Sequence, residues 1–286
     1  MVRISRRRFI IGSLTAAGAL VLSSMVPRIV IPSFSEAGIP SGIPPVEELK
    51  KTLPYAPLDP EDVRKRAYYY YHKHLHCGAG VFAGLVTALR EKVGGPWNNV
   101  PIMTLLWQKG GGEGWSVLCG ALAGAASVIS LVYGESKMTK KLIDDLFRWY
   151  ELHPFPSWTP DEETAKWAGA KVLGPLPTSV SFSVLCHVSV TRWCLTAKKA
   201  SCSPERAERC ARLAGEVAYH AAKILNMAYE GKFKPTVLEP LVVDPKYGCR
   251  SCHRKGVPYS EGGFTRGKMY CITCHRAPHL KLVPQG

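Results

Sequence analysis

Apolar residues recur at helical spacing from about residue 61 to residue 230. Within residues 78–93, for example, Val81, Leu85 and Leu89 lie along one stripe of a helix. No strand-like alternation of apolar and polar residues persists anywhere in the chain. The pattern therefore predicts an all-α protein, with a helical bundle domain over residues 61–230.

Capping and helix-breaking residues mark the ends of the predicted helices. Asp59-Pro60-Glu61 begins a helix toward His76, because a short polar side chain caps the first amides and proline fits the first turn. Ser203-Pro204-Glu205 begins a helix that reaches Tyr229 in the same way. The remaining predicted helices cover residues 78–93, 100–108, 116–133, 139–151 and 178–197, the last of them weakened by its β-branched residues.

Residues 1–37 have the pattern of an export signal. A twin-arginine sequence, Ser5-Arg6-Arg7-Arg8-Phe9-Ile10, precedes an apolar stretch, and Ala37 offers a small-residue cleavage site before Gly38. The apolar stretch is interrupted by glycines and is too weak for a transmembrane helix, which needs about 20 apolar residues. We expect a cleaved twin-arginine signal peptide and a periplasmic protein with no transmembrane helix in its mature chain; an uncleaved anchor is the alternative.

The charge pattern narrows the range of partners. The chain has a formal net charge of +15, but its basic residues are scattered and form no arm or stripe. We therefore expect no nucleic-acid partner. The excess positive charge can steer an acidic redox protein or a membrane surface toward the chain, or serve only solubility.

The regions on either side of the predicted bundle have different compositions. Residues 38–60 hold six prolines and predict an extended lead-in. Residues 231–286 are rich in Gly and Pro and predict a small, irregular segment. Two copies of Cys-x-x-Cys-His lie in that segment, and this pentapeptide is the attachment signature of a c-type haem.

The two motifs predict two haem c groups per chain. In each motif both sulfurs bond covalently to the porphyrin, and the histidine that follows binds the iron. The expected attachment residues are Cys249, Cys252, Cys271 and Cys274, and the expected proximal ligands are His253 and His275. A four-cysteine zinc site is the alternative, since 18 residues separate Cys252 from Cys271, but zinc would leave the two adjacent histidines unexplained.

A second cofactor is expected besides haem. Haem c is attached after export, whereas the twin-arginine route carries proteins that fold before export, commonly around a cofactor. Iron–sulfur clusters are bound by thiolates, and disulfides or free thiols are the alternative for an exported protein. Six cysteines lie outside the haem motifs: Cys77, Cys119, Cys186, Cys194, Cys202 and Cys210.

The cysteine and glycine pattern resembles a known family. Cys77-Gly78, the glycine run 110–114 and the sequence Cys119-Gly120-Ala121-Leu122-Ala123-Gly124 resemble the redox-active family described by the pattern C_GCAxxG_C_C. With the leader and the haem motifs, roughly residues 60–280 resemble the split-Soret cytochrome c family. The resemblance implies a homodimer with its haems gathered at one end, histidine on both faces of each iron, and an iron–sulfur centre.

The resemblance also implies a ligand set, in which Cys186 and Cys210 are the later cysteines of the pattern. Cys194 and Cys202 exceed the four cysteines that the pattern needs. Cys186 and Cys194 would stand about 12 Å apart along one straight helix, too far for one small cluster. We therefore expect Cys77, Cys119, Cys186 and Cys210 to hold the cluster, with Cys194 as a substitute and Cys202 as a spare thiol.

The distal haem ligands are the least determined part of the site. We expect His76 and His279, and a dimer partner could also donate one. The other candidates are His72, His74, His153, His187 and His220. Ligation by two histidines would leave no open iron position for a substrate.

The sequence thus favours a periplasmic electron-transfer cytochrome, which exchanges electrons with other redox proteins, over an enzyme. The alternative is a redox enzyme, such as a small-molecule reductase, that uses an open haem iron or an exposed cluster. A third interpretation makes the helical domain a docking module for a larger complex, with the haem segment carrying the electrons.

Overall fold

The computed structural model describes residues 43–236 together with residues 258, 268, 269 and 273. The predicted signal peptide and all the predicted haem-binding residues of the C-terminal segment lie outside this part of the chain; within the two motifs only Thr273 is described. The chain divides into two compact units at Leu49. Within the first, the described residues include one short helix, α2 (Val46–Leu49).

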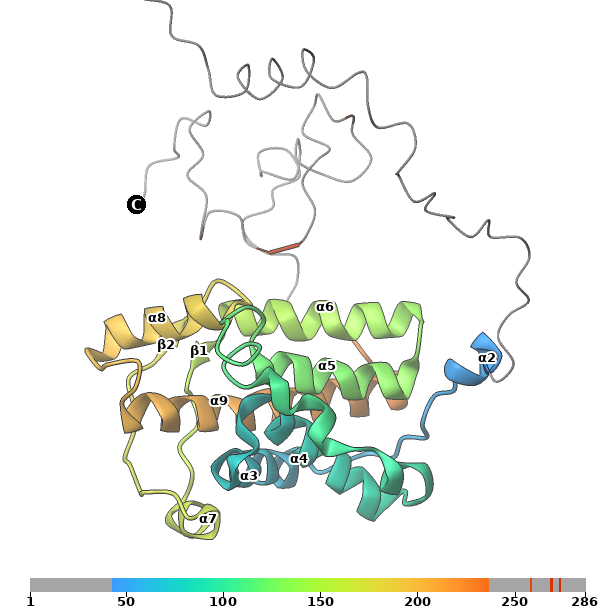
Figure 1. Cartoon of the computed structure of the whole chain (residues 1–286), viewed down its shortest axis with the longest axis horizontal. Coiled ribbons are helices and arrows are strands. Elements are labelled where there is room, and N and C mark those ends of the chain that lie inside the picture. The colour runs from blue at the N-terminus through green and yellow to red at the C-terminus, as the bar shows by residue number, and fades with distance from the viewer. Residues whose placement is uncertain (1–42, 237–257, 259–267, 270–272, 274–286) are drawn as a thin grey trace, which may run out of the picture. The chain divides into compact units, whose positions relative to one another are not determined.

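The second unit is a helical bundle (Figure 1). Its α-helices are α3 (Pro60–Tyr70), α4 (His76–Lys92), α5 (Gly120–Tyr133), α6 (Lys137–Leu152), α7 (Glu162–Ala168), α8 (Cys186–Ala197) and α9 (Pro204–Tyr229). Two 3₁₀ helices, η2 (Gly95–Asn99) and η3 (Ile102–Gln108), connect α4 to the loop before α5. The predicted all-α class is confirmed.

The predicted caps are present at the start of α3 and of α9. The Asp59 carboxylate accepts a hydrogen bond from the Glu61 amide at 2.9 Å. The Ser203 hydroxyl accepts one from the Arg206 amide at 3.2 Å. Each cap satisfies an amide that has no partner inside the helix.

The predicted helix over 178–197 is wrong in its first eight residues. Ser179–Val180 (β2) instead pairs antiparallel with Pro154–Phe155 (β1), and the helix α8 begins only at Cys186. The β-branched residues before Cys186 fit an extended backbone better than a helix. As a result Cys186 is the first residue of its helix and not an interior one.

The helix predicted toward His76 is also interrupted. α3 ends at Tyr70, and a π-helical turn (Tyr71–Leu75) follows in which Lys73 and His74 leave helical geometry, with φ +65° at His74. The interruption changes the direction of the chain immediately before Cys77. Such turns are frequent at functional sites.

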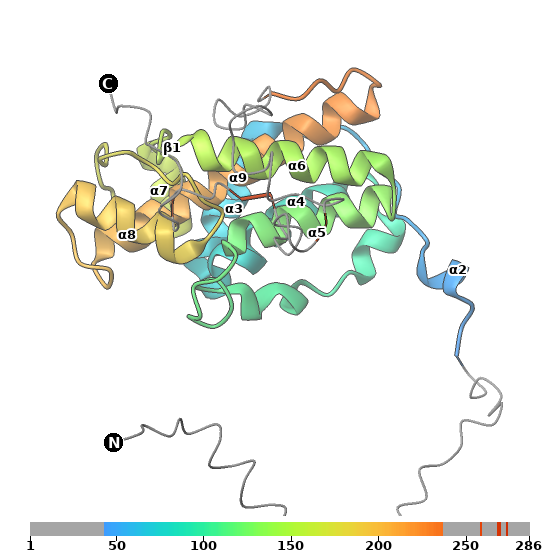
Figure 2. The same ribbon diagram turned by 90° about the horizontal axis from the view of Figure 1, so that it is seen from above.

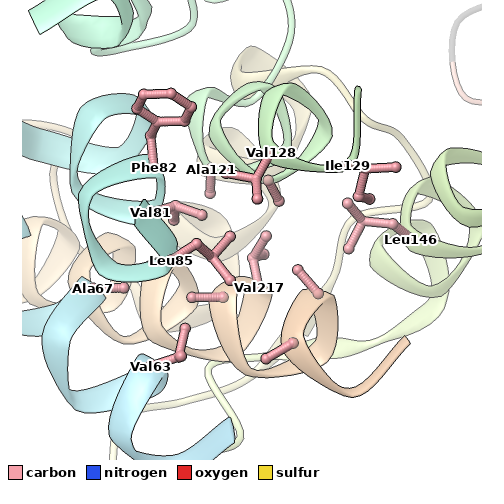
Figure 3. Packing of buried hydrophobic residues seen from close by; sticks show 14 of the residues in the cluster. Val63, Ala67, Val81, Phe82, Leu85, Ala121, Val128, Ile129, Leu146 and Val217 are labelled. Carbon is pink, nitrogen blue, oxygen red and sulfur yellow. The ribbon is translucent and has the colours of Figure 1, made fainter. Parts of the chain in front are cut away.

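The hydrophobic core lies where α9 packs against the other long helices. α9 contacts α3, α4, α5 and α6 along its length, and α6 lies beside α5 in both views (Figures 1 and 2). Figure 3 shows Val63 of α3, Leu85 of α4, Val128 of α5, Leu146 of α6 and Val217 of α9 meeting in this core. All five side chains are fully buried, so the bundle is a single packed body.

Glycines allow α4 to approach its neighbours at backbone distance. A methyl group at Gly84 would lie 2.9 Å from the amide nitrogen of Ala67 in α3. A methyl group at Gly124 in α5 would lie 2.4 Å from the carbonyl oxygen of Gly78 in α4. Gly84 and Gly124 therefore permit the close approach of α4 to α3 and to α5.

Helix α9 also buries an ion pair. Arg212 is fully buried; its Nε donates to Glu208 at 2.7 Å and its Nη2 to the Leu173 carbonyl at 2.6 Å. Glu208 also accepts from the Tyr68 hydroxyl at 3.0 Å. The charge of Arg212 is therefore neutralised inside the protein by a carboxylate on the same helix.

The Gly124 contact predicts that Gly124→Ala destabilises the bundle. The added methyl group cannot coexist with the Gly78 carbonyl, so α5 must move away from α4, at a cost of about 1–3 kcal/mol. The free energy of unfolding, measured by urea denaturation with circular dichroism, should fall by that amount. Ser130→Ala, at an exposed position of the same helix, should change it by less than about 0.5 kcal/mol. Equal stability of the two variants would show that this contact is not tight.

The buried ion pair predicts a larger effect for Glu208→Ala. Removing the carboxylate leaves the Arg212 guanidinium buried without a counter-charge, which typically costs about 3–5 kcal/mol. Thermal and urea unfolding of this variant should show that loss, whereas Glu91→Ala, which removes an exposed partner of Arg66, should have little effect. Similar stabilities of the two variants would contradict the buried role of Glu208.

Candidate metal centre

Four of the six cysteines outside the haem motifs come together although they lie on four different helices. Cys77 is the second residue of α4, Cys119 caps α5, Cys186 begins α8, and Cys210 lies in the second turn of α9. In each of the six possible pairs, the thiols are close enough for a charge on one to disfavour a charge on the other. The structure thus brings together the four cysteines of the expected ligand set.

A short backbone bridge holds Cys119 beside Cys186. Leu118 and Leu185 form an isolated antiparallel bridge. The Cys119 amide donates to the Val184 carbonyl at 2.9 Å, and the Cys186 amide donates to the Val117 carbonyl at 2.7 Å. The backbone segments that lead into α5 and α8 are therefore hydrogen-bonded to each other, and this places Cys119 beside Cys186.

Two glycines allow the backbone to approach the cysteine side chains closely. A methyl group at Gly120 would lie 2.7 Å from the Cys77 sulfur, and one at Gly111 would lie 2.8 Å from the Cys186 Cβ. Gly111 also has φ +73°, a conformation that L residues with side chains rarely adopt. The glycine run therefore packs against the cysteine group, as expected for a loop beside a buried cofactor.

Cys77, Cys119 and Cys186 have raised pKa values, so these three thiols are protonated at neutral pH in the absence of metal. Burial, together with the neighbouring thiols Cys119 and Cys210, raises the pKa of Cys77 to about 12. Burial also raises the pKa of Cys119 and of Cys186. A metal that binds here must therefore displace protons.

Helix N-termini partly offset this cost for an anionic sulfur. The amides of Gly78 and Gly110 hydrogen-bond to Cys77 sulfur and lower its pKa, and those of Ala121 and Leu122 do the same for Cys119. Cys186 also stands at the start of its helix, where the helix dipole favours negative charge. For three of the four thiols, backbone amides or the start of a helix thus reduce the cost of forming a thiolate.

A buried arginine stands beside these thiols. Arg209 is 1% exposed; its Nη2 donates to the Ser189 hydroxyl at 2.8 Å and its Nη1 to the Cys210 sulfur at 3.8 Å. Its Nε has no hydrogen-bond partner, and no carboxylate pairs with it in the described part of the chain. An arginine is always charged, so the site holds a positive charge that protonated thiols do not neutralise.

The donor set and the charge both fit an iron–sulfur cluster. Thiolates are the usual ligands of such clusters, and their negative charge would neutralise the Arg209 guanidinium. A single zinc ion, with Zn–S bonds of about 2.3 Å, would require all four sulfurs within about 4 Å of each other. Among the residues described, no group of three or more His, Cys, Asp or Glu has the arrangement of a single-ion site. None of the six cysteines described forms a disulfide.

The two surplus cysteines lie apart from this group. α8 runs without interruption from Cys186 to Ala197, so Cys194 stands two turns, or about 12 Å, from Cys186 along the axis. Among the four grouped thiols, Cys194 interacts with Cys210 alone. Cys202 is exposed in the turn before α9.

His76 lies directly before Cys77 and has φ +54°. Its partial burial, with the nearby charge of Lys109, lowers its pKa, which favours the neutral imidazole that binds iron. The break at His74 separates it from His72, whose ring bonds to Glu208 at 3.1 Å. The two histidines therefore do not share one helix face, and the other expected distal ligand, His279, lies outside the described residues.

Most other candidate distal histidines already have partners. His153 bonds to Glu216 at 3.1 Å, and His220 bonds to Asp145 at 3.3 Å. These two histidines also line a cavity of about 310 Å³, together with Arg64 and two tryptophans. None of the cysteines lines that cavity.

One residue of the second haem motif is described. The Thr273 hydroxyl donates to the Phe182 carbonyl at 2.8 Å. Phe182 lies four residues before Cys186, and its own amide donates to the Glu151 carbonyl of α6 at 2.8 Å. Upstream, the Lys268 carbonyl accepts from Arg148 Nη2, also in α6, at 3.1 Å. Thr273, the one described residue of the second haem motif, is therefore hydrogen-bonded to the segment that leads into the cysteine site.

Arg209, Ser189 and Tyr150 contact this site but belong to no motif that singles them out in the sequence. The available signal was a charged residue on the apolar stripe of a long helix, since Arg209 is in register with Leu213 and Val217. This pattern predicts that the charge is buried, but it does not predict which groups surround it.

In the part of the chain that the structure describes, no helix combines the length and the apolar character needed to span a membrane.

Comparison with known proteins agrees with this site. Residues 76–224 match the family model described as "Putative redox-active protein (C_GCAxxG_C_C)". The chain is 39% identical over 222 residues to split-Soret cytochrome c of Desulfovibrio desulfuricans, covering 76% of this chain and 75% of the relative.

A solved structure of the split-Soret cytochrome c from Desulfovibrio desulfuricans, described as having a novel iron centre, superposes with a TM-score of 0.71 at 37% identity. The match covers 79% of this chain and 91% of that structure. The chain therefore belongs to the C_GCAxxG_C_C family, together with split-Soret cytochrome c.

Proposed function

We propose that this protein is a periplasmic dihaem c-type cytochrome that also carries an iron–sulfur cluster and transfers electrons between other redox proteins. The observation that carries the proposal is the meeting of Cys77, Cys119, Cys186 and Cys210 beside the unneutralised charge of Arg209. A metal-free pocket of this kind is costly, and a cluster held by four thiolates removes the cost.

The haem part of the proposal is supported by the sequence. Both Cys-x-x-Cys-His motifs carry the complete set of attachment cysteines and a proximal histidine, His253 or His275. The matched relative is a cytochrome c whose solved structure is described as having an iron centre, which agrees with haem and a second metal site.

Each centre accepts and returns one electron at a time, with a redox protein as donor and another as acceptor. The attachment of Thr273 to the segment before Cys186 supports an electron path between the second haem and the cluster. Cleavage after residue 37 removes five arginines and one glutamate and leaves a formal net charge of +11, which favours acidic partners. We further propose a homodimer exported by the twin-arginine route, with distal histidines that include His76 and His279.

The direct test is the visible spectrum of the purified protein when oxidised, reduced, and reduced under carbon monoxide, with iron and acid-labile sulfide quantified per chain. Two haems per chain, a spectrum indifferent to carbon monoxide, and iron beyond that of haem would support the proposal. Iron equal to haem would contradict the cluster. A carbon monoxide shift would reveal an open iron position and support a redox enzyme instead.

The ligand set predicts that Cys119→Ser loses most of the non-haem iron. A serine hydroxyl stays protonated at neutral pH and is a poor ligand for iron in a sulfur-rich site. Non-haem iron and acid-labile sulfide should fall, while haem content stays at the wild-type value. Cys202→Ser makes the same substitution at an exposed position and should retain both. Unchanged non-haem iron in Cys119→Ser would exclude Cys119 as a ligand.

The attachment motifs predict that Cys274→Ala loosens or loses one haem. The variant keeps only one of the two thioether bonds of that haem, so covalently bound haem per chain should fall by up to half in mass spectrometry. The helical signal in circular dichroism should persist, because the bundle core does not depend on this residue. A full complement of covalent haem with two thioether bonds each would contradict the assignment.

A further inference from the structure

Helix α9 carries two buried arginines that differ in whether a carboxylate neutralises their charge. Arg212 is fully buried and is neutralised by Glu208 at 2.7 Å. Arg209, three residues earlier, is as deeply buried but has no carboxylate partner among the residues described, and its Nε is unpaired. The chain thus supplies an anion for one guanidinium and none for the other.

The groups that do face Arg209 are those of the cysteine site. Its Nη1 approaches the Cys210 sulfur at 3.8 Å, and its Nη2 donates to the Ser189 hydroxyl at 2.8 Å. The Ser189 and Tyr150 hydroxyls lie 3.0 Å apart, and the Tyr150 hydroxyl in turn hydrogen-bonds to the Cys119 sulfur. The side chains of Ser189, Tyr150 and Cys119 are all buried.

These contacts form a directed chain of hydrogen bonds when Cys119 is a thiolate. Arg209 donates to Ser189, and the Tyr150 proton goes to the Cys119 sulfur, because a thiolate can only accept. The hydrogen bond that Tyr150 donates to Ser189 in the structure then reverses, and the Ser189 proton is directed to the Tyr150 oxygen. The buried charge of Arg209 therefore acts on two of the four thiols. It contacts Cys210 directly and reaches Cys119 through the hydroxyl groups of Ser189 and Tyr150.

We propose that Arg209, acting directly on Cys210 and through Ser189 and Tyr150 on Cys119, is a positioning residue that raises the reduction potential of the cluster. The inference rests on the proposed function, since it requires a cluster on these thiols. Reduction adds one electron and its negative charge to the cluster, and no bond forms or breaks in the protein. A buried cation next to the cluster stabilises that added charge strongly, because little water screens it. Hydrogen bonds to the cluster sulfurs act in the same direction.

The test is a redox titration of the full-length, haem-loaded protein, followed by electron paramagnetic resonance for the cluster and by visible absorption for the haems. Arg209→Gln should lower the cluster potential by the equivalent of a tenfold or larger change in the reduction equilibrium, about 59 mV for one electron. Arg209→Lys keeps the charge and should shift the potential less. Tyr150→Phe keeps the charge of Arg209 and removes the hydroxyl that bonds to both Ser189 and Cys119, so it should lower the potential by a smaller amount than Arg209→Gln.

Lys223→Gln is the matched control. It removes an exposed positive charge from the same helix, about 21 Å further along the axis, where solvent screens it. Its cluster potential should equal that of the wild type. The haem potentials in every variant provide an internal reference for unrelated changes.

The outcomes separate this inference from the function on which it rests. A wild-type protein without acid-labile sulfide would overturn the cluster itself. A wild-type cluster whose potential is unchanged in both Arg209→Gln and Tyr150→Phe would overturn only the role of Arg209. If Arg209→Gln fails to retain the cluster, the potential of Tyr150→Phe decides, and an unchanged value there contradicts the proposed chain of hydrogen bonds.

Discussion

Helices α4 and α5 meet through glycine backbone, and this contact determines where the cysteines stand. Because Gly124 lies against the Gly78 carbonyl, the starts of the two helices are held at backbone distance. Gly120 then leaves room for the Cys77 sulfur beside the first turn of α5. A side chain at either glycine would separate Cys77 from Cys119, so the packing of the core and the geometry of the site are one constraint.

Different contacts place the other two thiols, Cys186 and Cys210, beside this pair. Cys186 is brought in by the backbone bridge between Leu118 and Leu185, and Cys210 by the packing of α9 against α3 and α4. Four helices thus contribute one sulfur each. A site of this construction loses its arrangement when any one helix moves, and a cluster bound to all four sulfurs would in turn hold the helices together.

The two buried arginines of α9 serve different purposes, one in the fold and one at the cysteine site. Near its start, Glu208 and Arg212 neutralise each other and stabilise the bundle without reference to any cofactor. Arg209 lies between them in the sequence but faces the thiols, where its charge is useful only when a negatively charged group is present. The same helix therefore supports the fold with one arginine and, in our proposal, adjusts an electron-transfer centre with the other.

The amino-acid sequence by itself determined the all-α class, the caps of α3 and α9, and the two haem motifs, because each depends on residues close together along the chain. It also named the cysteines and histidines from which a site could be built. Only the tertiary structure decided that Cys77, Cys119, Cys186 and Cys210 meet while Cys194 and Cys202 lie apart, and that the chain breaks at His74. It alone placed Arg209 and Tyr150 beside the sulfurs. Those relations join residues up to 133 positions apart, and they depend on how closely helices pack and on which buried charges lack a partner, neither of which is encoded in local sequence.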